Sequence, residues 1–295
     1  MADDLDFSKP AGGPKPGAAP AAPAPAPAPV YIPAIARAFF ESVGKEEAVQ
    51  PGHVFFAEKE KAGFLRRDKM YFLVEGQVGL VAKGQAIGFV KAGEIFGEMG
   101  AMTEAARSAT AVAKAQCRVL SIDDKQFNSA LQKKPEFALM MMGVMIMRLR
   151  GMIAKQSGVP NAGGVKESPR VFDKKLLDSL AAGLGEEAKT RYDKGKVIMV
   201  AGQTGALMYV VLEGRVAISI RGALVQYVGA GGVFGEMALV DQSPRSANAA
   251  AESDCVLLGI NRHVFLNLVK TDPVFGASLL GAVAERVRNT AAGLN

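Results

Sequence analysis

The sequence has few residues of the kinds that build disulfide frameworks, metal sites or membrane spans. Its two cysteines lack paired spacing, so nothing indicates a disulfide framework and a cytoplasmic protein is expected. His53 and His263 stand alone, so we expect no metal and no cofactor. The longest apolar run, "FALMMMGVMIM" before Arg148, is too short to span a bilayer. The acidic start "MADDLDFSKP" has no apolar segment and is not a secretory signal.

The sequence also lacks the patterns of a catalyst or of a nucleic-acid binder. No nucleophile with a neighbouring base is visible, so we expect no enzyme activity. The net charge is +6, but lysine and arginine are scattered along the chain. Proteins that bind nucleic acids gather these residues on one face or helix, so a solvated surface is the better interpretation.

Proline is concentrated at one end. Nine of the fifteen prolines lie between Pro10 and Pro33, in an alternation of alanine and proline. Such a segment cannot build a core or a regular hydrogen-bond ladder. We therefore expect residues 1–33 to form a disordered, extended tail.

The rest of the chain is a duplication. Gly235 lies 138 positions after Gly97, and this repeat offset also relates "MYFLVEG" to "MYVVLEG", Cys117 to Cys255 and Pro135 to Pro273. The duplication predicts one domain over residues 34–157, a linker over 158–168 and a second domain over 169–295.

Each repeat combines short strands with helices. Runs of β-forming residues ended by glycine predict a small antiparallel barrel or jelly roll. After each barrel the hydrophobic period changes, and two helices are expected on either side of Pro135 or Pro273. A helical stretch also precedes each barrel. The fold class is therefore α+β, with two tandem antiparallel β-barrel or jelly-roll domains flanked by helices.

One cassette recurs in both copies, as "FGEMGAMTEAARSATA" from Phe96 and "FGEMALVDQSPRSANA" from Phe234. A glycine lets a ligand approach the backbone, and an arginine supplies a planar fork for phosphate oxygens. A glutamate would repel phosphate, but it suits a hydroxyl donor such as a ribose 2′-OH. With one arginine and no lysine-bearing glycine loop, the pattern favours a nucleotide with a single phosphodiester charge.

This pattern resembles the phosphate-binding cassette of cyclic nucleotide-binding domains, as in the catabolite activator protein and the regulatory subunits of cAMP-dependent kinase. The resemblance covers most of residues 34–295, twice. It implies that the glutamate binds the ribose 2′-OH and that the arginine binds the cyclic phosphate. The residues it places in the two sites are Gly97, Glu98, Met99, Arg107 and Ser108, and Gly235, Glu236, Met237, Arg245 and Ser246.

The two sites are expected to differ. Ala106 stands in the first cassette where the second has Pro244, and Glu104 adds a charge where Gln242 is neutral, so the second site should bind more tightly. By the resemblance, Thr290 is either a reader of the base or an ordinary surface residue. Ser108 and Ser246, which follow the arginines, resemble the activator protein more than cGMP-selective kinases, and this resemblance implies cAMP in preference to cGMP.

These features predict a stand-alone, bacterial-type cyclic nucleotide receptor that signals to a protein partner by rearranging its helices. With no residues after Asn295, we expect no DNA-binding domain. A nucleic-acid regulator without a recognisable helix-turn-helix and a cyclic di-GMP receptor are the alternatives. The helix after the first barrel is apolar around its circumference, so it is expected to pack on another helix. That helix belongs either to the second domain or to another chain, and we favour a homodimer through residues 136–157.

Overall fold

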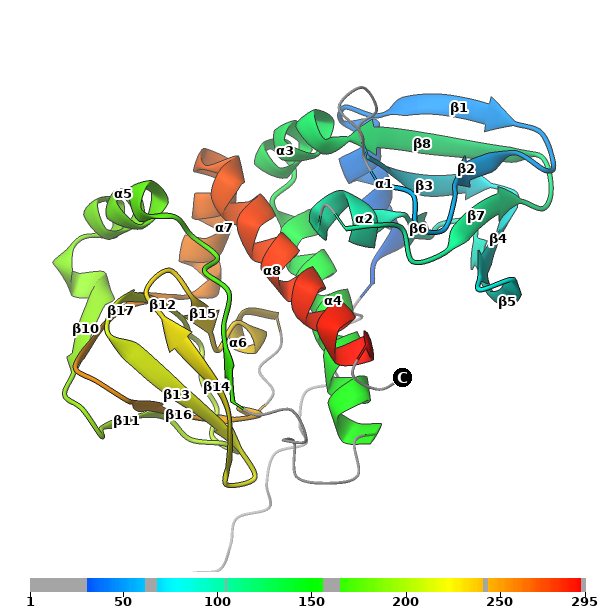
Figure 1. Ribbon diagram of the computed structural model, residues 1–295. Helices are drawn as coiled ribbons and strands as arrows, with labels where there is room; N and C mark the ends of the chain where they lie inside the picture. The colour runs from blue at the N-terminus through cyan, green and yellow to red at the C-terminus, as the bar shows by residue number, and fades with distance from the viewer. Residues whose placement is uncertain (1–30, 62–67, 104, 156–164, 241–243, 293–295) are drawn as a thin grey trace, which may run out of the picture.

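The computed structural model describes residues 31–61, 68–103, 105–155, 165–240 and 244–292. Two β-rich domains lie on either side of two long helices, α4 (Glu136–Lys155) and α8 (Pro273–Ala292), which run side by side (Figure 1). The disordered tail predicted from composition lies, as far as residue 30, outside the described residues.

The first domain holds two four-stranded antiparallel sheets, in the orders β1-β8-β3-β6 and β2-β7-β4-β5. Its other elements are α1 (Pro33–Glu41), β1 (Lys45–Val49), β2 (Val54–Phe56), β3 (Lys69–Glu75), β4 (Gln77–Ala82), β5 (Gln85–Lys91), β6 (Ile95–Phe96), α2 (Glu98–Thr103), β7 (Thr110–Ala113), β8 (Cys117–Asp123) and α3 (Asp124–Lys133). Aromatic and aliphatic side chains such as Phe55, Leu73 and Val119 are buried between the sheets.

The second domain repeats this plan, with sheets in the orders β10-β17-β12-β15 and β11-β16-β13-β14-β9. Its other elements are β9 (Lys166–Glu167), α5 (Lys174–Leu184), the 3-10 helix η1 (Glu186–Ala188), β10 (Lys189–Tyr192), β11 (Val197–Met199), β12 (Met208–Glu213), β13 (Arg215–Ile220), β14 (Ala223–Gly229), β15 (Val233–Phe234), α6 (Met237–Val240), β16 (Asn248–Ala251), β17 (Cys255–Ile260) and α7 (Arg262–Thr271).

The strand register confirms the duplication. Leu73 pairs with Val119, and Val211 pairs with Leu257, the two residues that the repeat offset relates to that first pair. The glycine predicted to turn the chain after β3 adopts a φ of +99° at Gly76, where a Cβ atom would lie 2.5 Å from the Gln116 carbonyl oxygen. Only glycine meets both conditions, so the sequence ends the strand at this position.

A capping box and a proline set the start and the end of particular helices. The Asp123 side chain accepts a hydrogen bond from the Gln126 backbone N–H, and the Gln126 side chain returns one, which forms a capping box at the start of α3. The break between the last two helices of each domain falls at Pro135 and Pro273, as predicted.

Composition placed the first domain boundary too late in the chain. The Tyr31 hydroxyl donates to the Gly93 carbonyl oxygen at 2.7 Å, and α1 begins at Pro33. Residues 31–33, which were counted with the tail, therefore contact the first domain. At the other boundary, β9 comes from the expected linker and pairs with β14 of the second domain.

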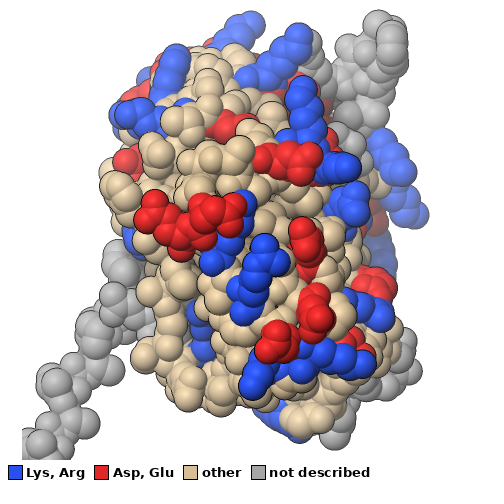
Figure 2. All heavy atoms as spheres, turned by 90° about the vertical axis from the view of Figure 1, so that its left-hand side faces the viewer, with Lys and Arg blue, Asp and Glu red and all other residues tan. Residues whose placement is uncertain are grey.

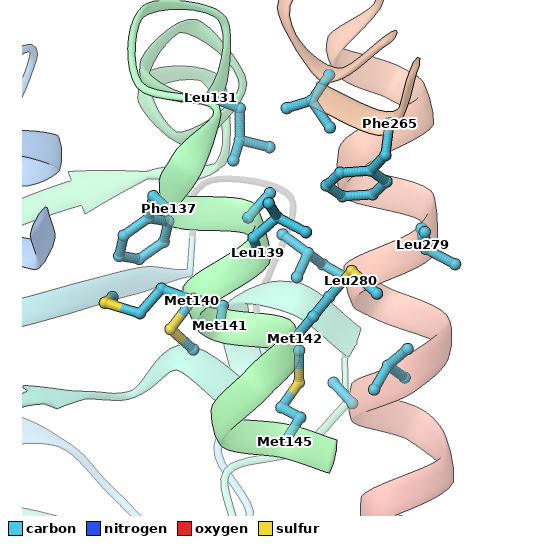
Figure 3. Packing of buried hydrophobic residues seen from close by; sticks show 14 of the residues in the cluster. Leu131, Phe137, Leu139, Met140, Met141, Met142, Met145, Phe265, Leu279 and Leu280 are labelled. Carbon is cyan, nitrogen blue, oxygen red and sulfur yellow. The ribbon is translucent and has the colours of Figure 1, made fainter. Parts of the chain in front are cut away.

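The apolar circumference of α4 is explained by packing within the chain. Met141, Met142 and Met145 are fully buried, and Figure 3 shows Met142 and Leu280 between α4 and α8. On another side of α4, the Phe137 ring stacks on Phe39 of α1 at 3.6 Å. Two partners were considered for this helix, the second domain and another chain. Helix α8 of the second domain covers this face of α4.

The two long helices also reach across the domains. Helix α8 packs on α2 of the first domain, and α4 packs on α6 of the second. At Gly281 the approach is so close that a Cβ atom would lie 2.8 Å from the Met102 carbonyl oxygen. Each cassette helix is thus in contact with the long helix of the other domain.

Candidate functional site

Both cassettes turn sharply at their glycine. Gly97 and Gly235 follow the short strands β6 and β15 with φ values of +78° and +72°, which L side chains rarely adopt. A Cβ atom at Gly97 would lie 2.9 Å from the Phe56 ring, and one at Gly235 would lie 2.9 Å from Arg245 Nη1. The glycines are required by backbone conformation and by the arginines that pack beneath them.

The two cassette arginines are anchored in the same way. Arg107 donates from Nη1 to the Gly97 carbonyl oxygen at 2.6 Å and from Nη2 to that of Lys69 at 2.7 Å. Arg245 makes the equivalent bonds to Gly235 at 3.0 Å and Leu207 at 2.8 Å. Neutral carbonyl groups fix each guanidinium but do not balance its charge.

The surroundings of the two arginines differ. Arg107 is only 5% exposed, lies 3.0 Å from a carboxylate oxygen of Asp68 and stacks 4.3 Å from the Phe56 ring centroid. Among the described residues, Arg245 has no carboxylate within ion-pair distance. Burial lowers the pKa of the Arg245 guanidinium, because desolvation disfavours its charged form. The positive charge of the second cassette is therefore the less compensated.

The cassette glutamates are buried and pair with helix arginines. Glu98 and Glu236 are 7% and 4% exposed. Glu98 accepts from Arg148 Nη1 of α4 at 3.1 Å, and Glu236 accepts from Arg286 Nη1 of α8 at 2.6 Å. A second nitrogen of Arg286 donates to the Val233 carbonyl oxygen at 2.7 Å. Each cassette glutamate therefore pairs with an arginine of a long helix and not with the arginine of its own cassette.

Sequence reasoning missed Arg148 and Arg286, although a signal was present. The two arginines are separated by the same repeat offset that relates the two cassettes. Their environments differ, since the Arg148 side chain is 52% exposed and that of Arg286 is 20% exposed. The link between cassette and helix is therefore better shielded from water in the second domain.

The five residues predicted for the first site line one cleft of about 500 Å³. They are Gly97, Glu98, Met99, Arg107 and Ser108. Tyr31, Phe89 and Arg148 line the same cleft but were not predicted. Burial raises the pKa of the Tyr31 phenol, with further contributions from Glu94 and Glu98, so the hydroxyl remains a hydrogen-bond donor.

The remaining predicted residues include some whose side chains lie outside the described part of the chain. Ser246 is exposed, and its hydroxyl lies 3.4 Å from the Met237 sulfur. Thr290 lies in α8, but its side chain is outside the described part of the chain. Glu104 and Gln242 also lie outside the described residues, whereas Pro244 is exposed. Among the described residues, no cluster of three or more His, Cys, Asp and Glu could hold a metal ion.

Comparison with known proteins decides the family. The model for the cyclic nucleotide-binding domain matches residues 46–134 and 189–272, which together make up more than half of the chain. The chain belongs to the cyclic nucleotide-binding domain family. Each matched range contains one barrel and one cassette, so the protein carries two such domains.

Among its relatives are cyclic AMP receptor and kinase regulatory proteins. The chain is 33% identical over 102 residues to the cyclic AMP receptor protein of Thermus thermophilus, covering 33% of this chain and 47% of the relative. It is 29% identical over 196 residues to the cAMP-dependent protein kinase regulatory subunit of Aspergillus niger, covering 65% and 43%. The chain thus spans less than half the length of these curated relatives.

A similar solved structure is the regulatory domain of Toxoplasma gondii PKA with cAMP. It is 19% identical, with 85% of this chain and 86% of that chain covered at a TM-score of 0.29. None of the described helices of the present protein is long and apolar enough to cross a membrane.

Proposed function

We propose that this protein is a cyclic nucleotide receptor that binds cAMP in preference to cGMP in both cassettes and signals to a protein partner. The observation that carries the proposal is the repeated pairing of a buried cassette glutamate with an arginine on a long helix. A buried carboxylate is costly unless it is paired, so two such pairs at equivalent positions point to a role for this link.

The cassette arginine supplies the contact to phosphate. Two carbonyl groups hold each guanidinium, and the Nε of Arg107 is buried without a hydrogen-bond partner among the described residues. A cyclic phosphate offers acceptor oxygens and one negative charge, which complements the guanidinium charge of Arg245 and adds to the partial compensation of Arg107 by Asp68. We therefore assign Arg107 and Arg245 to the phosphate.

The cassette glutamate supplies the contact to the sugar. A carboxylate only accepts hydrogen bonds when ionised, and a ribose 2′-OH is a suitable donor. Arg148 and Arg286 bind these same carboxylates. A nucleotide that engages Glu98 or Glu236 therefore alters the ion pair that ties α4 or α8 to the cassette.

This shared carboxylate provides a route from ligand to helix. Since α4 also packs on α6, and α8 on α2, a shift of either helix reaches both cassettes and their outer surfaces. Such a shift requires the ligand to bind the two helix arrangements with different affinity. We propose that a protein partner recognises one of these arrangements.

The preference for cAMP rests on the serines after the arginines and on relatives named as cyclic AMP receptor and cAMP-dependent kinase regulatory proteins. The second site is proposed as the tighter one, because Arg245 lacks the competing carboxylate that Arg107 has in Asp68 among the described residues. The proposed location is the cytoplasm, and no catalytic role is proposed.

The alternative of a nucleic-acid regulator is less well supported. On the face seen in Figure 2, lysine and arginine alternate with aspartate and glutamate and form no continuous basic patch among the described residues. Nucleic-acid binding through phosphates requires such a patch and weakens steeply with salt.

A competition experiment tests the choice of ligand. A fluorescent cAMP analogue bound to the full chain is displaced with cAMP, cGMP and cyclic di-GMP in turn. We expect cAMP to compete at the lowest concentration. Displacement by cyclic di-GMP but not by cAMP would overturn the assignment and select the cyclic dinucleotide alternative. The same samples with duplex DNA, at two salt concentrations, test the nucleic-acid alternative.

A further inference from the structure

The first cleft contains polar groups that the proposed contacts to phosphate and sugar leave unused. Among the described residues, the nitrogen- or oxygen-bearing side chains that line it are those of Tyr31, Glu94, Glu98, Arg107, Ser108 and Arg148. Arg107 and Ser108 belong to the proposed phosphate contact. Glu98 and Arg148 belong to the proposed sugar contact. Tyr31 and Glu94 are left for the base of the nucleotide.

The other side chains that line this cleft include a group of apolar ones. Leu80 comes from β4, Ile87 and Phe89 come from β5, and Val144 comes from α4. Ile87 and Phe89 are 59% and 56% exposed. The flat faces of a purine suit such a wall, but the polar edge of the base finds no hydrogen-bond partner in it. A polar group of the cleft has to meet that edge.

Tyr31 can act toward a ligand only as a hydrogen-bond acceptor. Its hydroxyl donates to the Gly93 carbonyl oxygen at 2.7 Å, which uses the single proton of the phenol. Burial raises the pKa of this phenol, and the charges of Glu94 and Glu98 raise it further, so the proton is retained at neutral pH. The phenol oxygen keeps lone pairs for a donor on the ligand.

Glu94 adds a second acceptor close to the first. Its carboxylate accepts a hydrogen bond from the Lys91 backbone N–H at 2.8 Å and is exposed. An ionised carboxylate has no proton to donate. Because the charge of Glu94 acts on the Tyr31 phenol, the two groups lie near each other. Together they offer a ligand acceptors and no free donor.

The same turn in the second domain has a different residue after its glycine. The Gly93 N–H donates to the Leu73 carbonyl oxygen at 2.7 Å, and the Gly231 N–H donates to that of Val211 at 2.8 Å. The two turns are therefore equivalent by contact as well as by sequence. The glycine is followed by a glutamate in the first domain and by Gly232 in the second, which has no carboxylate.

The group that binds the carbonyl oxygen of this turn also differs. In the second domain, the backbone N–H groups of Val171 and Phe172 donate to the Gly231 carbonyl oxygen at 2.8 and 3.0 Å. The Phe172 side chain is fully buried and stacks on Phe275. Two backbone donors thus occupy the oxygen whose equivalent in the first domain binds the phenol of Tyr31.

We propose that the Tyr31 phenol oxygen, with Glu94 beside it, accepts a hydrogen bond from an amino group of the base in the first cleft, and that the second cleft has no equivalent of this contact. The inference rests on the proposed function and extends it to a residue outside the cassette. The exocyclic amino group of adenine is a donor, whereas hypoxanthine has an acceptor oxygen at that position. Two acceptors that face each other lose the hydrogen bond and remain desolvated.

Calorimetric titration of the full chain with cAMP and with inosine 3′,5′-cyclic monophosphate tests the assignment. Arg245→Ala isolates the first site, and Arg107→Ala isolates the second. Tyr31→Phe, added to each, keeps the ring and removes the oxygen. Tyr192→Phe, which removes a hydroxyl from β10 of the second domain, is the matched control. At the first site we expect the control to prefer cAMP by about fivefold and Tyr31→Phe to lose this preference, because only the affinity for cAMP falls. The second site should be unaffected by Tyr31→Phe.

Three results would overturn the assignment in a chain that binds cAMP. They are a first site without preference for cAMP in the control, a preference that persists in Tyr31→Phe, and an equal loss of affinity for both nucleotides. The last would mean that the hydroxyl only holds the chain before α1. All three leave the receptor function standing. A wild type that binds neither nucleotide would refute the proposed function itself, and the inference with it. Thermal unfolding confirms that the variants are folded.

Discussion

Glu236 on the turn after β15 and Arg286 on α8 form an ion pair at 2.6 Å that joins the second cassette to the long helix of its domain. The carboxylate is almost fully buried, and the guanidinium is fixed further by the Val233 carbonyl oxygen. Because the same arrangement recurs at Glu98 and Arg148, the link belongs to the repeated design of the domain.

Removing the arginine should destabilise the second domain. Arg286→Met leaves the buried Glu236 carboxylate without its partner, which should lower the free energy of unfolding by about 3 kcal/mol. Arg288→Met is the matched control, since Arg288 forms a half-exposed pair with Glu285 within the helix, worth about 1 kcal/mol or less. Urea unfolding measures both. Equal losses in the two variants would contradict a special role for Arg286.

Ligand binding should change the protection of the long helices. With saturating cAMP, we expect amide hydrogen exchange to change in both α4 and α8, because the ligand competes for the carboxylates that hold Arg148 and Arg286. The same measurement on Arg107→Ala/Arg245→Ala serves as the control. Unchanged protection of both helices in the wild type at saturation would show that binding is not passed to them.

Substitution of the cassette glycine separates backbone strain from site geometry. Gly235→Ala and Gly222→Ala both place a side chain at positive φ, and each should cost about 1–2 kcal/mol of stability. Only at Gly235 would the new Cβ meet the arginine, since nothing lies within 4 Å of Gly222. We therefore expect calorimetry to show weaker cAMP binding for Gly235→Ala alone. Equal affinity for cAMP in both variants would show that Gly235 does not shape the ligand site.

The close approach of α8 to the first cassette is testable at Gly281. Alanine in a helix is favoured over glycine by up to about 1 kcal/mol, and Gly183→Ala in α5, with open space around it, should show that gain. Gly281→Ala should instead lower the free energy of unfolding, because its Cβ would collide with the Met102 carbonyl oxygen. Thermal unfolding compares them. A higher melting temperature for both variants would mean that α8 does not pack closely on α2.

The repeat in the sequence was sufficient to predict the barrels, the turns and both cassettes. Side-chain periodicity and turn residues determine local structure. Because a constant offset relates Gly97 to Gly235, each element predicted in one domain could be checked against its equivalent in the other. Arg148 and Arg286 were missed because the helix was searched for residues that read the base, although they obey the same offset.

Other features depend on contacts that no local pattern encodes. Proline content assigned Tyr31 to the tail, whereas its hydroxyl binds Gly93 of the first domain. The apolar surface of α4 showed that a partner helix was needed but not which one. Only the folded chain shows that α8 fills that position.

The stoichiometry of cAMP binding tests the central claim most directly. Isothermal titration calorimetry of the full chain should give two ligands per chain in the wild type and one in either Arg107→Ala or Arg245→Ala. The double variant should bind none, because losing the partner of a buried phosphate costs about 3–5 kcal/mol at each site. Arg215→Ala, outside the cassettes, should still bind two. A wild type that saturates with one ligand, or a double variant that loses less than about tenfold in affinity, would contradict the account.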